Sequence, residues 1–364
     1  MGWERYQNFG NVPSGLIFII FGYYQCNFMK RVTVKDLAKH LLLSTSTVSR
    51  ALLNDKNIHW ETKKKVLEAA KELGYRRNSA ATSLKYGQSK NIGLVVPEMV
   101  TPFSAKVLRG IQEVLYPLGY RVIITECDED PQRERENLLL LEEFNVDGII
   151  INLCDETKNS DIYQQLLDQG IPLIFFDRMP NDSLNVSKVR LDNPLYATAM
   201  IEHLVATGRK KIVHIMGPPT LRSSGERAKG YIEVMKKHGI YDPSLLIEAG
   251  GLGFEDGKKA IKSLRETQVE FDAIFAFTDT LAIGAMNFLL EAGILIPEEV
   301  SVTSFSGTEL ATMVYPQLSS VEPPLVQMGE EAARLVLEKI KDFNAESRDV
   351  VVEAELKIRA SSSF

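Results

Sequence analysis

Seven short apolar runs alternate with amphipathic helical stretches across residues 91–364, and this alternation limits the fold more than any other feature. The runs are Ile92–Pro97, Arg121–Thr125, Asp147–Asn152, Pro172–Asp177, Lys211–Met216, Ala273–Thr278 and Val300–Phe305. Continuous apolar runs separated by helices are typical of parallel strands that are covered on both faces. We predict an α/β body of two parallel sheets flanked by helices, with a first lobe at about 91–191 plus a C-terminal return and a second lobe at about 192–322.

Charge is distributed unevenly along the chain. The whole chain has a formal net charge of −6, yet residues 30–90 hold 14 Lys+Arg and only 5 Asp+Glu, which leaves residues 91–364 strongly acidic. A compact basic segment is the electrostatic pattern expected of nucleic-acid binding, although a solvated surface gives the same count.

The basic segment contains the signals of three short helices. Thr33 and Asp36 have the spacing of a capping box, Ser44 is a second N-cap residue, and a third helix runs from Trp60 to Leu73 before Gly74. The expected inward residues are Leu37, Ala38 and Leu41; Val48, Ala51 and Leu52; and Val66, Leu67, Ala70 and Leu73. A tight turn joins the first two helices, so residues 30–76 are predicted to form a helix-turn-helix domain.

The outer face of the second predicted helix consists of short hydroxyls and one guanidinium. Its residues are Thr45, Ser46, Thr47, Ser49 and Arg50. Such groups reach phosphates and base edges when the N-terminus of a helix enters the major groove. A plain solvent-exposed Ser/Thr face is the alternative, and the basic charge together with the tight turn favours DNA binding.

This head resembles the N-terminal headpiece of the LacI/GalR family of bacterial transcription regulators. The similar segments are Val32–Ala38, Ser44–Leu52, Lys65–Tyr75 and Asn78–Leu84. The resemblance implies that Thr45 and Ser46 read bases, that Arg50 makes a further base contact, and that Leu84 of a hinge helix wedges into the minor groove. Residues 77–90 are then the hinge helix and linker. The predicted DNA-contacting set is Thr33, Ser44, Thr45, Ser46, Thr47, Ser49, Arg50, Asn78 and Leu84.

Three positions of the head depart from the family's pattern. Leu42 stands where the family commonly has the glycine of the turn, His59 where it commonly has a serine cap, and Thr82 where it often has an arginine. A leucine in a left-handed turn is strained by about 1–2 kcal/mol.

The ends of the predicted strands place polar side chains at one edge of each sheet, where open α/β sheets bind ligands. These include Asp177, Arg178, the loop ending at Arg227, Gly250–Gly253 and Asp279. Taken singly, each is equally explained as a strand-end cap or a salt bridge.

The acidic body resembles the family's two-lobed effector domain, which is similar to periplasmic sugar-binding proteins. Gly208–Ile212, Glu226–Tyr231, Phe277–Ala285 and Tyr315–Val321 carry the likeness. The resemblance places Arg227 and Asp279 on ligand-binding positions, Phe103 and Asp177 in the pocket lining, and Leu252 where an aromatic often stacks on the sugar. The predicted effector-binding set is Phe103, Asp177, Arg178, Arg227, Leu252 and Asp279.

No catalytic or metal-binding motif occurs in the sequence. GxGxxG in the right context, GxxxxGK[ST] and GxSxG are absent, and the histidines are isolated. Cys26, Cys127 and Cys154 are far apart and form no CxxC pair or cysteine/histidine grouping, so we predict no metal, no cofactor and a reduced, cytoplasmic protein.

The N-terminal apolar run Leu16–Tyr24 has nine residues, too few for the roughly 20 that span a bilayer. We interpret residues 1–29 as an extension arising from a start codon upstream of Met29, and a short interfacial anchor is the alternative. No membrane association is predicted.

These features together predict a non-enzymatic transcriptional repressor that binds double-stranded operator DNA and is controlled by a sugar-like small molecule held between the lobes of residues 91–364. The alternative is a sugar-binding sensor or transport protein without a DNA role. A homodimer is expected because one headpiece reads one half-site. Its predicted interface includes Val107, Ile111, Ile283, Met286 and Leu290.

Overall fold

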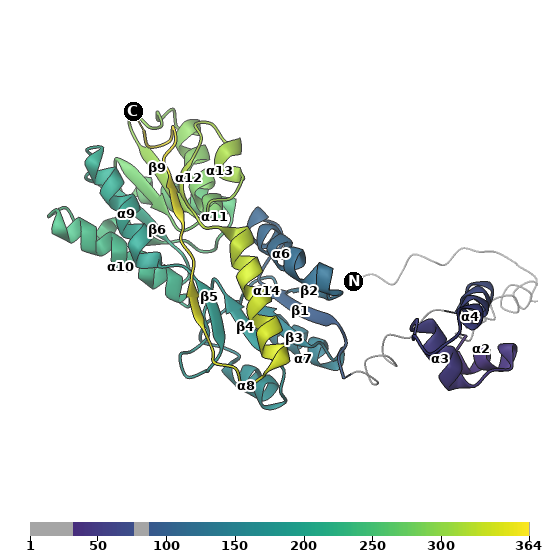
Figure 1. The fold of residues 1–364 in the computed structure, drawn as a ribbon. Coiled ribbons are helices and arrows are strands. Elements are labelled where there is room, and N and C mark those ends of the chain that lie inside the picture. Colours follow the sequence, from purple (N-terminus) through teal and green to yellow (C-terminus); the bar gives the residue numbers. More distant parts are fainter. Residues whose placement is uncertain (1–31, 76–86, 364) are drawn as a thin grey trace, which may run out of the picture. The chain divides into compact units, whose positions relative to one another are not determined.

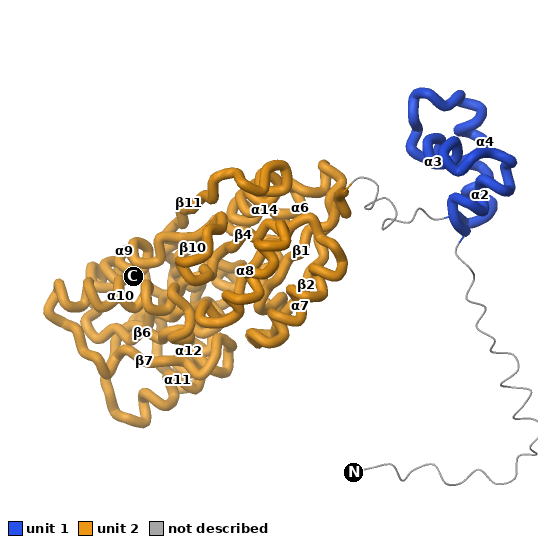
Figure 2. The backbone as a smooth tube through the Cα atoms, turned by 90° about the horizontal axis from the view of Figure 1, so that it is seen from below, with its two compact units in different colours: residues 1–82 blue, residues 83–364 orange. Residues whose placement is uncertain are grey.

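The computed structural model describes residues 32–75 and 87–363, and the chain divides into two units, residues 1–82 and 83–364 (Figure 2). The expectations for residues 1–29, Asn78, Thr82 and Leu84 therefore concern positions outside the described residues.

The first unit contains the three expected helices, α2 (Val34–Leu41), α3 (Thr45–Leu52) and α4 (Trp60–Glu72) (Figure 1). Its buried core consists of Leu37, Ala38, Val48, Ala51, Val66, Ala69 and Ala70. One predicted core position is wrong, because Leu67 is 56% exposed and Ala69 is buried instead. The stripe that α4 buries is narrow, and it runs through Val66, Ala69 and Ala70 at helical spacing.

The second unit contains two six-stranded sheets. The first has the order β11-β5-β4-β3-β1-β2, and the second has the order β12-β10-β9-β8-β6-β7. Every neighbouring pair is parallel except β10 and β12. The first-sheet strands are β1 (Asn91–Val96), β2 (Arg121–Glu126), β3 (Gly148–Ile151), β4 (Leu173–Phe176), β5 (Ser187–Arg190) and β11 (Asp349–Val351). The second-sheet strands are β6 (Ile212–Met216), β7 (Leu246–Glu248), β8 (Ala273–Ala276), β9 (Ser301–Phe305), β10 (Ser319–Glu322) and β12 (Glu355–Lys357).

Helices cover both faces of each sheet. The first sheet lies between α6 (Pro102–Leu115) with α14 (Leu325–Lys341) and α7 (Pro131–Glu143) with α8 (Ser160–Asp168). The second lies between α9 (Asn193–Ala206) with α10 (Arg222–Lys237) and α11 (Phe254–Glu266) with α12 (Asp279–Glu291). The short elements are α13 (Leu310–Met313) and two 3-10 turns, Tyr116–Leu118 and Pro243–Leu245. In β3, Ile150 joins one apolar cluster while Ile149 and Ile151 join the other, which explains the continuous apolar run.

The predicted α/β fold is confirmed, and all seven predicted strands are present. Sequence analysis missed β5, β7, β10, β11 and β12. Each has only three or four residues, and several alternate polar and apolar side chains at a sheet edge.

The chain passes between the two sheets three times. The crossings are residues 191–192 after β5, residues 323–324 after β10 and residues 352–354 after β11. The last crossing is the C-terminal segment, drawn in yellow in Figure 1, which contributes β11 to the first sheet and β12 to the second.

Part of the predicted dimer interface is wrong. Val107, Ile111 and Met286 are buried within the chain, while Ile283 is half-buried and Leu290 is 47% exposed. On the first lobe, α6 and α14 approach backbone to backbone, since a Cβ at Gly110 would lie 1.9 Å from the Val326 carbonyl oxygen. Val107 and Ile111 therefore serve this internal packing.

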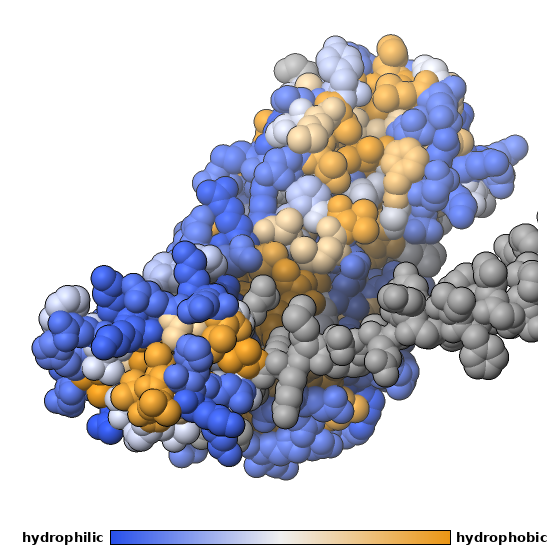
Figure 3. Space-filling model, turned by 90° about the vertical axis from the view of Figure 1, so that its right-hand side faces the viewer, coloured by the Kyte–Doolittle hydropathy of each residue, from blue (hydrophilic) through white to orange (hydrophobic). Residues whose placement is uncertain are grey.

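The surface of the molecule is largely hydrophilic on the face drawn in Figure 3, with apolar residues gathered in separate patches. Among the described residues, no helix is both long and apolar enough to traverse a bilayer.

Candidate functional site

The exposed N-terminal turn of α3 carries a hydrogen-bonded group of hydroxyls. The Ser44 side chain accepts a hydrogen bond from the Thr47 backbone N–H at 3.1 Å, and its Oγ lies 2.8 Å from both the Ser46 and the Thr47 hydroxyl oxygens. Thr45 and Ser46 are exposed, as is Arg50, whose Nε donates to the Ser46 carbonyl at 3.4 Å. The capped helix thus presents its free N-terminal backbone N–H groups, short hydroxyls and one guanidinium to solvent.

Thr33 and Ser49 lie at the edge of this face. Thr33 completes a capping box with Asp36, its backbone N–H donating to Asp36 Oδ2 at 2.8 Å, and Ser49 is half-buried. Thr33 is exposed at the start of α2 and offers a hydroxyl there.

Both departures from the family's pattern in the described head have structural consequences. Leu42 caps α2 in the left-handed region, with φ 53° and ψ 36°, and its side chain is 92% exposed. His59 occupies the N-cap of α4 without a side-chain capping hydrogen bond.

A cavity of about 220 Å³ lies between the lobes, near the first crossing. First-lobe residues, the crossing and the start of α10 all contribute to its lining, which consists of Glu156, Asp177, Met179, Asp182, Lys188, Arg190, Leu191, Asn193, Arg222, Ser223, Glu226 and Asp349. The lining is polar and charged, with five carboxylates and three cations.

The three cations in the cavity wall are paired with carboxylates. Arg222 of α10 reaches across to the first lobe, with its Nη2 3.0 Å from Asp182 Oδ2 and its Nε 3.8 Å from Glu156 Oε2. Lys188 lies 3.4 Å from Asp182, and Arg190 lies 2.9 Å from Asp349. Burial raises the pKa of Glu156 to about 7, against the opposing effects of a backbone N–H of Met179 and the Arg222 charge. Arg222 therefore joins the lobes within the cavity wall.

Arg227 lies directly behind the cavity wall. It is 5% exposed, its Nε donates to Asn193 Oδ1 at 3.0 Å, and its Nη1 donates to the Phe277 carbonyl at 2.7 Å. The guanidinium carbon is 3.6 Å from the centre of the Phe305 ring and 4.3 Å from that of Phe277. Burial lowers the pKa of Arg227 to about 10. Arg227 thereby fixes Asn193, which lines the cavity and also donates to Glu226 at 3.0 Å.

Asp279 is enclosed within the second lobe. It is 2% exposed and accepts four hydrogen bonds, at 2.6 Å and 2.9 Å from the Ser304 and Ser320 hydroxyls, and at 2.7 Å and 2.8 Å from the Thr308 N–H and hydroxyl. The carboxylate joins α12 to the ends of β9 and β10.

Asp177 and Arg178 follow β4 and point to different surroundings. Asp177 lines the cavity and has a left-handed backbone, with φ 62°. Burial raises the pKa of its carboxyl group, while Arg178, Arg227 and a hydrogen bond with Asn152 oppose that rise. Arg178 is 8% exposed and forms a bidentate pair with Glu129, at 2.6 Å and 2.8 Å, and also donates to the Leu153 carbonyl at 3.1 Å.

Phe103 and Leu252 are half-buried and pack against apolar clusters of the first and second lobe respectively. Of the six predicted effector residues, Asp177 alone belongs to the lining of this cavity, and Arg227 supports it through Asn193. Sequence analysis missed Glu156, Asn193, Arg222 and Glu226. Arg222 and Glu226 lay within the predicted loop ending at Arg227, while Glu156 and Asn193 lay outside the segments that were singled out.

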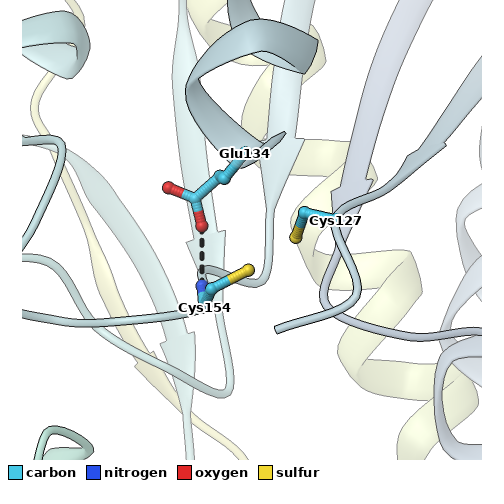
Figure 4. Close-up of side chains that lie close together, drawn as sticks. All are labelled: Cys127, Glu134 and Cys154. Carbon is cyan, nitrogen blue, oxygen red and sulfur yellow. Dashed lines mark hydrogen bonds between the residues drawn. The ribbon is translucent and has the colours of Figure 1, made fainter. Parts of the chain in front are cut away.

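A second polar group, outside the cleft, is formed by Cys127, Glu134 and Cys154 (Figure 4). Their sulfur and carboxylate oxygen atoms all lie within 4.8 Å of one another, and all three residues are buried. The chain brings together two cysteines that are 27 positions apart, which spacing along the sequence could not indicate.

Comparison with known proteins matches both units. Residues 89–360 match the periplasmic binding proteins and sugar binding domain of the LacI family, and residues 33–78 match the bacterial regulatory proteins of the lacI family. The chain is 30% identical to the ribose operon repressor of Halalkalibacterium halodurans over 91% of this chain and 97% of that protein.

The chain is similar to many solved structures, among them two regulator complexes. A complex of the transcriptional regulator CelR with cellobiose has a TM-score of 0.69 and 27% identity, covering 91% of this chain and 100% of that one. The lac repressor dimer bound to operator and the anti-inducer ONPF has a TM-score of 0.80 at 22% identity, covering 92% and 100%, and supports the fold.

Proposed function

The chain belongs to the LacI family of bacterial regulatory proteins, and from that premise we propose which residues read DNA and what class of ligand the cleft holds. The protein is a DNA-binding transcriptional repressor regulated by a small-molecule effector. We propose that it acts in the cytoplasm as a homodimer and by binding rather than by catalysis.

The DNA-reading residues are Thr45, Ser46 and Arg50 of α3. The observation that carries this assignment is the exposed, Ser44-capped start of α3, because short hydroxyls and a guanidinium at a helix N-terminus fit the major groove. The hydroxyls of Ser44, Thr47, Ser49 and Thr33 are proposed to contact phosphates and so to fix the docking of the helix. Asn78 and Leu84 are proposed to bind the minor groove by family resemblance.

The test is operator selection from a random duplex library with the full chain, followed by fluorescence anisotropy at one fixed salt concentration. Each of Thr45→Ala, Ser46→Ala and Arg50→Ala should reduce the binding preference for selected DNA over random DNA by about 1–3 kcal/mol. Lys71→Ala removes an exposed charge from α4 and is the matched control, which should leave the preference unchanged. An unchanged preference in all three α3 variants would refute the assignment.

The ligand is proposed to be a polyhydroxyl compound without net negative charge, such as a neutral sugar. Carboxylates outnumber cations in the cavity lining, and Lys188, Arg190 and Arg222 are each paired with one of them. Asp177 and Glu226 therefore offer acceptors to ligand hydroxyls, whereas an anionic ligand would bring further negative charge to a lining in which carboxylates outnumber cations. Cellobiose, named with the similar regulator CelR, is a neutral sugar.

A thermal-shift panel separates these classes. Neutral sugars and nucleosides are compared with sugar acids and sugar phosphates, and a ligand at 100 times its Kd should add about 2.7 kcal/mol of stability. Asp177→Asn should weaken binding of the neutral ligand. Asp242→Asn, which replaces an exposed carboxylate on the second lobe, is the control. Stabilisation by a sugar phosphate but by no neutral compound would overturn the proposed class.

A further inference from the structure

Cys127 and Cys154 are brought together by the parallel pairing of the first sheet. Strands β2 and β3 both flank β1, Cys127 directly follows β2, and Cys154 follows β3 by three residues. The end of β1 holds both loops, since the Cys127 N–H donates to the Val96 carbonyl at 3.0 Å and the Asn152 N–H donates to the Val95 carbonyl at 2.9 Å. The two thiols therefore lie beside the carboxyl ends of the same three neighbouring strands, β3, β1 and β2.

Glu134, on α7, brings a carboxylate to these thiols. It is fully buried, and it accepts hydrogen bonds from the Cys154 N–H at 2.6 Å, from Asn159 Nδ2 at 2.8 Å and from the Tyr163 hydroxyl. These three donors hold the carboxylate in one orientation. Among the described residues, no lysine or arginine forms an ion pair with Glu134. A buried carboxylate without a cationic partner is unusual, since buried charges are commonly paired or coordinate metals.

The three side chains have the chemistry and spacing of a metal site. Thiolates are soft ligands that favour zinc and related ions, and a carboxylate oxygen is a common third zinc ligand. Zinc bonds of about 2.3 Å to sulfur and 2.0–2.2 Å to oxygen place ligand atoms about 3.5–3.8 Å apart in a tetrahedron. The ligand atoms here lie within 4.8 Å, so small side-chain rotations close the difference.

We propose that Cys127, Glu134 and Cys154 bind one thiophilic divalent cation of the zinc class. Binding releases the two thiol protons to solvent, and two thiolates with one carboxylate then carry three negative charges against the two positive charges of the ion. Arg178 lies beside this excess, because its Nη1 donates to the Cys154 carbonyl at 3.3 Å. The ion would pin the loops after β2 and β3, which also hold Arg178 through Glu129 and the Leu153 carbonyl.

A disulfide between the same cysteines is the competing interpretation. Oxidation-sensing cysteines are solvent-accessible, whereas Cys127 is 0% and Cys154 is 5% exposed. A disulfide also brings no cation to the buried Glu134 carboxylate, whereas a bound divalent ion coordinates it directly.

The experiment uses the full chain, reduced and freed of metal by a chelator. Zn²⁺ is titrated against a chromophoric chelator, and Co²⁺ is used as a spectroscopic probe for thiolate-to-metal charge transfer. The expected result is one Zn²⁺ per chain, a raised Tm and a thiolate–cobalt absorption band. Cys127→Ala and Cys154→Ala should each weaken Zn²⁺ affinity by more than about 10–100-fold, which is the loss typical when only a residue that hydrogen-bonds a metal ligand is removed.

Two further variants make the result specific. Cys26→Ala removes the third cysteine and should bind Zn²⁺ as the parent does. Glu134→Gln keeps an oxygen acceptor and the side-chain volume. It should weaken Zn²⁺ binding while the far-ultraviolet circular dichroism spectrum stays that of the parent. If the cysteine variants misfold, the Glu134→Gln result alone decides between binding and no effect.

Three outcomes would overturn the proposal. One is no Zn²⁺ retained against the chelator, and another is equal Zn²⁺ binding by a Cys127→Ala/Cys154→Ala double variant, which marks adventitious binding elsewhere. The third is loss of two hydrogen masses on treatment with peroxide in a chain that binds no Zn²⁺, which assigns the thiols to disulfide chemistry. None of these readouts depends on DNA or effector.

Discussion

Replacing Leu42 by glycine should stabilise the DNA-binding head. Leu42 has φ 53°, a conformation that strains a leucine by about 1–2 kcal/mol. Its side chain is 92% exposed, so little packing is lost with it, and its backbone N–H continues to cap α2. Glycine has a larger conformational entropy in the unfolded chain, which offsets about 0.5–1 kcal/mol. The net gain expected for Leu42→Gly is therefore about 0.5–1 kcal/mol.

The matched control is the same substitution at a second exposed leucine. Leu67 is 56% exposed but lies inside α4, where a glycine should cost about 1 kcal/mol. Amide hydrogen exchange of the full chain, read by mass spectrometry on peptides from α2 to α4, measures both changes in one unit. Leu42→Gly should slow exchange roughly threefold and Leu67→Gly should speed it about fivefold. Faster exchange in both variants would refute the strain argument, because it would show that the left-handed turn costs leucine nothing.

The remaining predictions concern caps, titration, buried polar groups and assembly. His59→Ser should supply the absent side-chain cap of α4 and stabilise that helix by about 1 kcal/mol, which slower amide exchange in α4 would show. Exchange in the second unit is the internal control. Because the pKa of Glu156 is raised to about 7, the unfolded chain loses this proton first, and stability should fall by about 1–2 kcal/mol between pH 4.5 and 7. Urea titrations at several pH values should show that slope in the parent and lose it in Glu156→Gln; an equal slope in both would count against it. Asp279→Asn should destabilise the second lobe by about 2–3 kcal/mol, since an amide cannot accept from every donor around it, and Asp242→Asn should not. Light scattering of the full chain should give the mass of a dimer, and a monomer that still binds operator would exclude the homodimer.

The sequence predicted elements better than it predicted contacts. The seven apolar strands and the caps at Thr33 and Ser44 are local signals, and the structure contains them. Leu67 was predicted to be buried but is exposed, because it lies one position beyond Val66 at the edge of the stripe that α4 buries. Arg178 illustrates the larger limit, since its partner Glu129 lies 49 residues earlier in another loop.

The same limit applies to both candidate sites in the body. Arg222 lines the cavity because it pairs with Asp182 of the opposite lobe. Cys127 lies near Cys154 because β2 and β3 both flank β1. Periodicity along the chain identifies strands and helix faces, but neither pairing follows from it.

The three crossings between the sheets determine the order in which the body can be completed during synthesis. The first sheet needs β11 at its edge and α14 over one face, although its first five strands end at Arg190. The second sheet needs β12, which ends at Lys357. A ribosome must therefore make nearly the whole chain before either lobe has its full complement of strands, and until then the apolar face that α14 covers stays open to chaperones and proteases. A nonsense mutation anywhere upstream of β11 thus leaves both lobes unfinished.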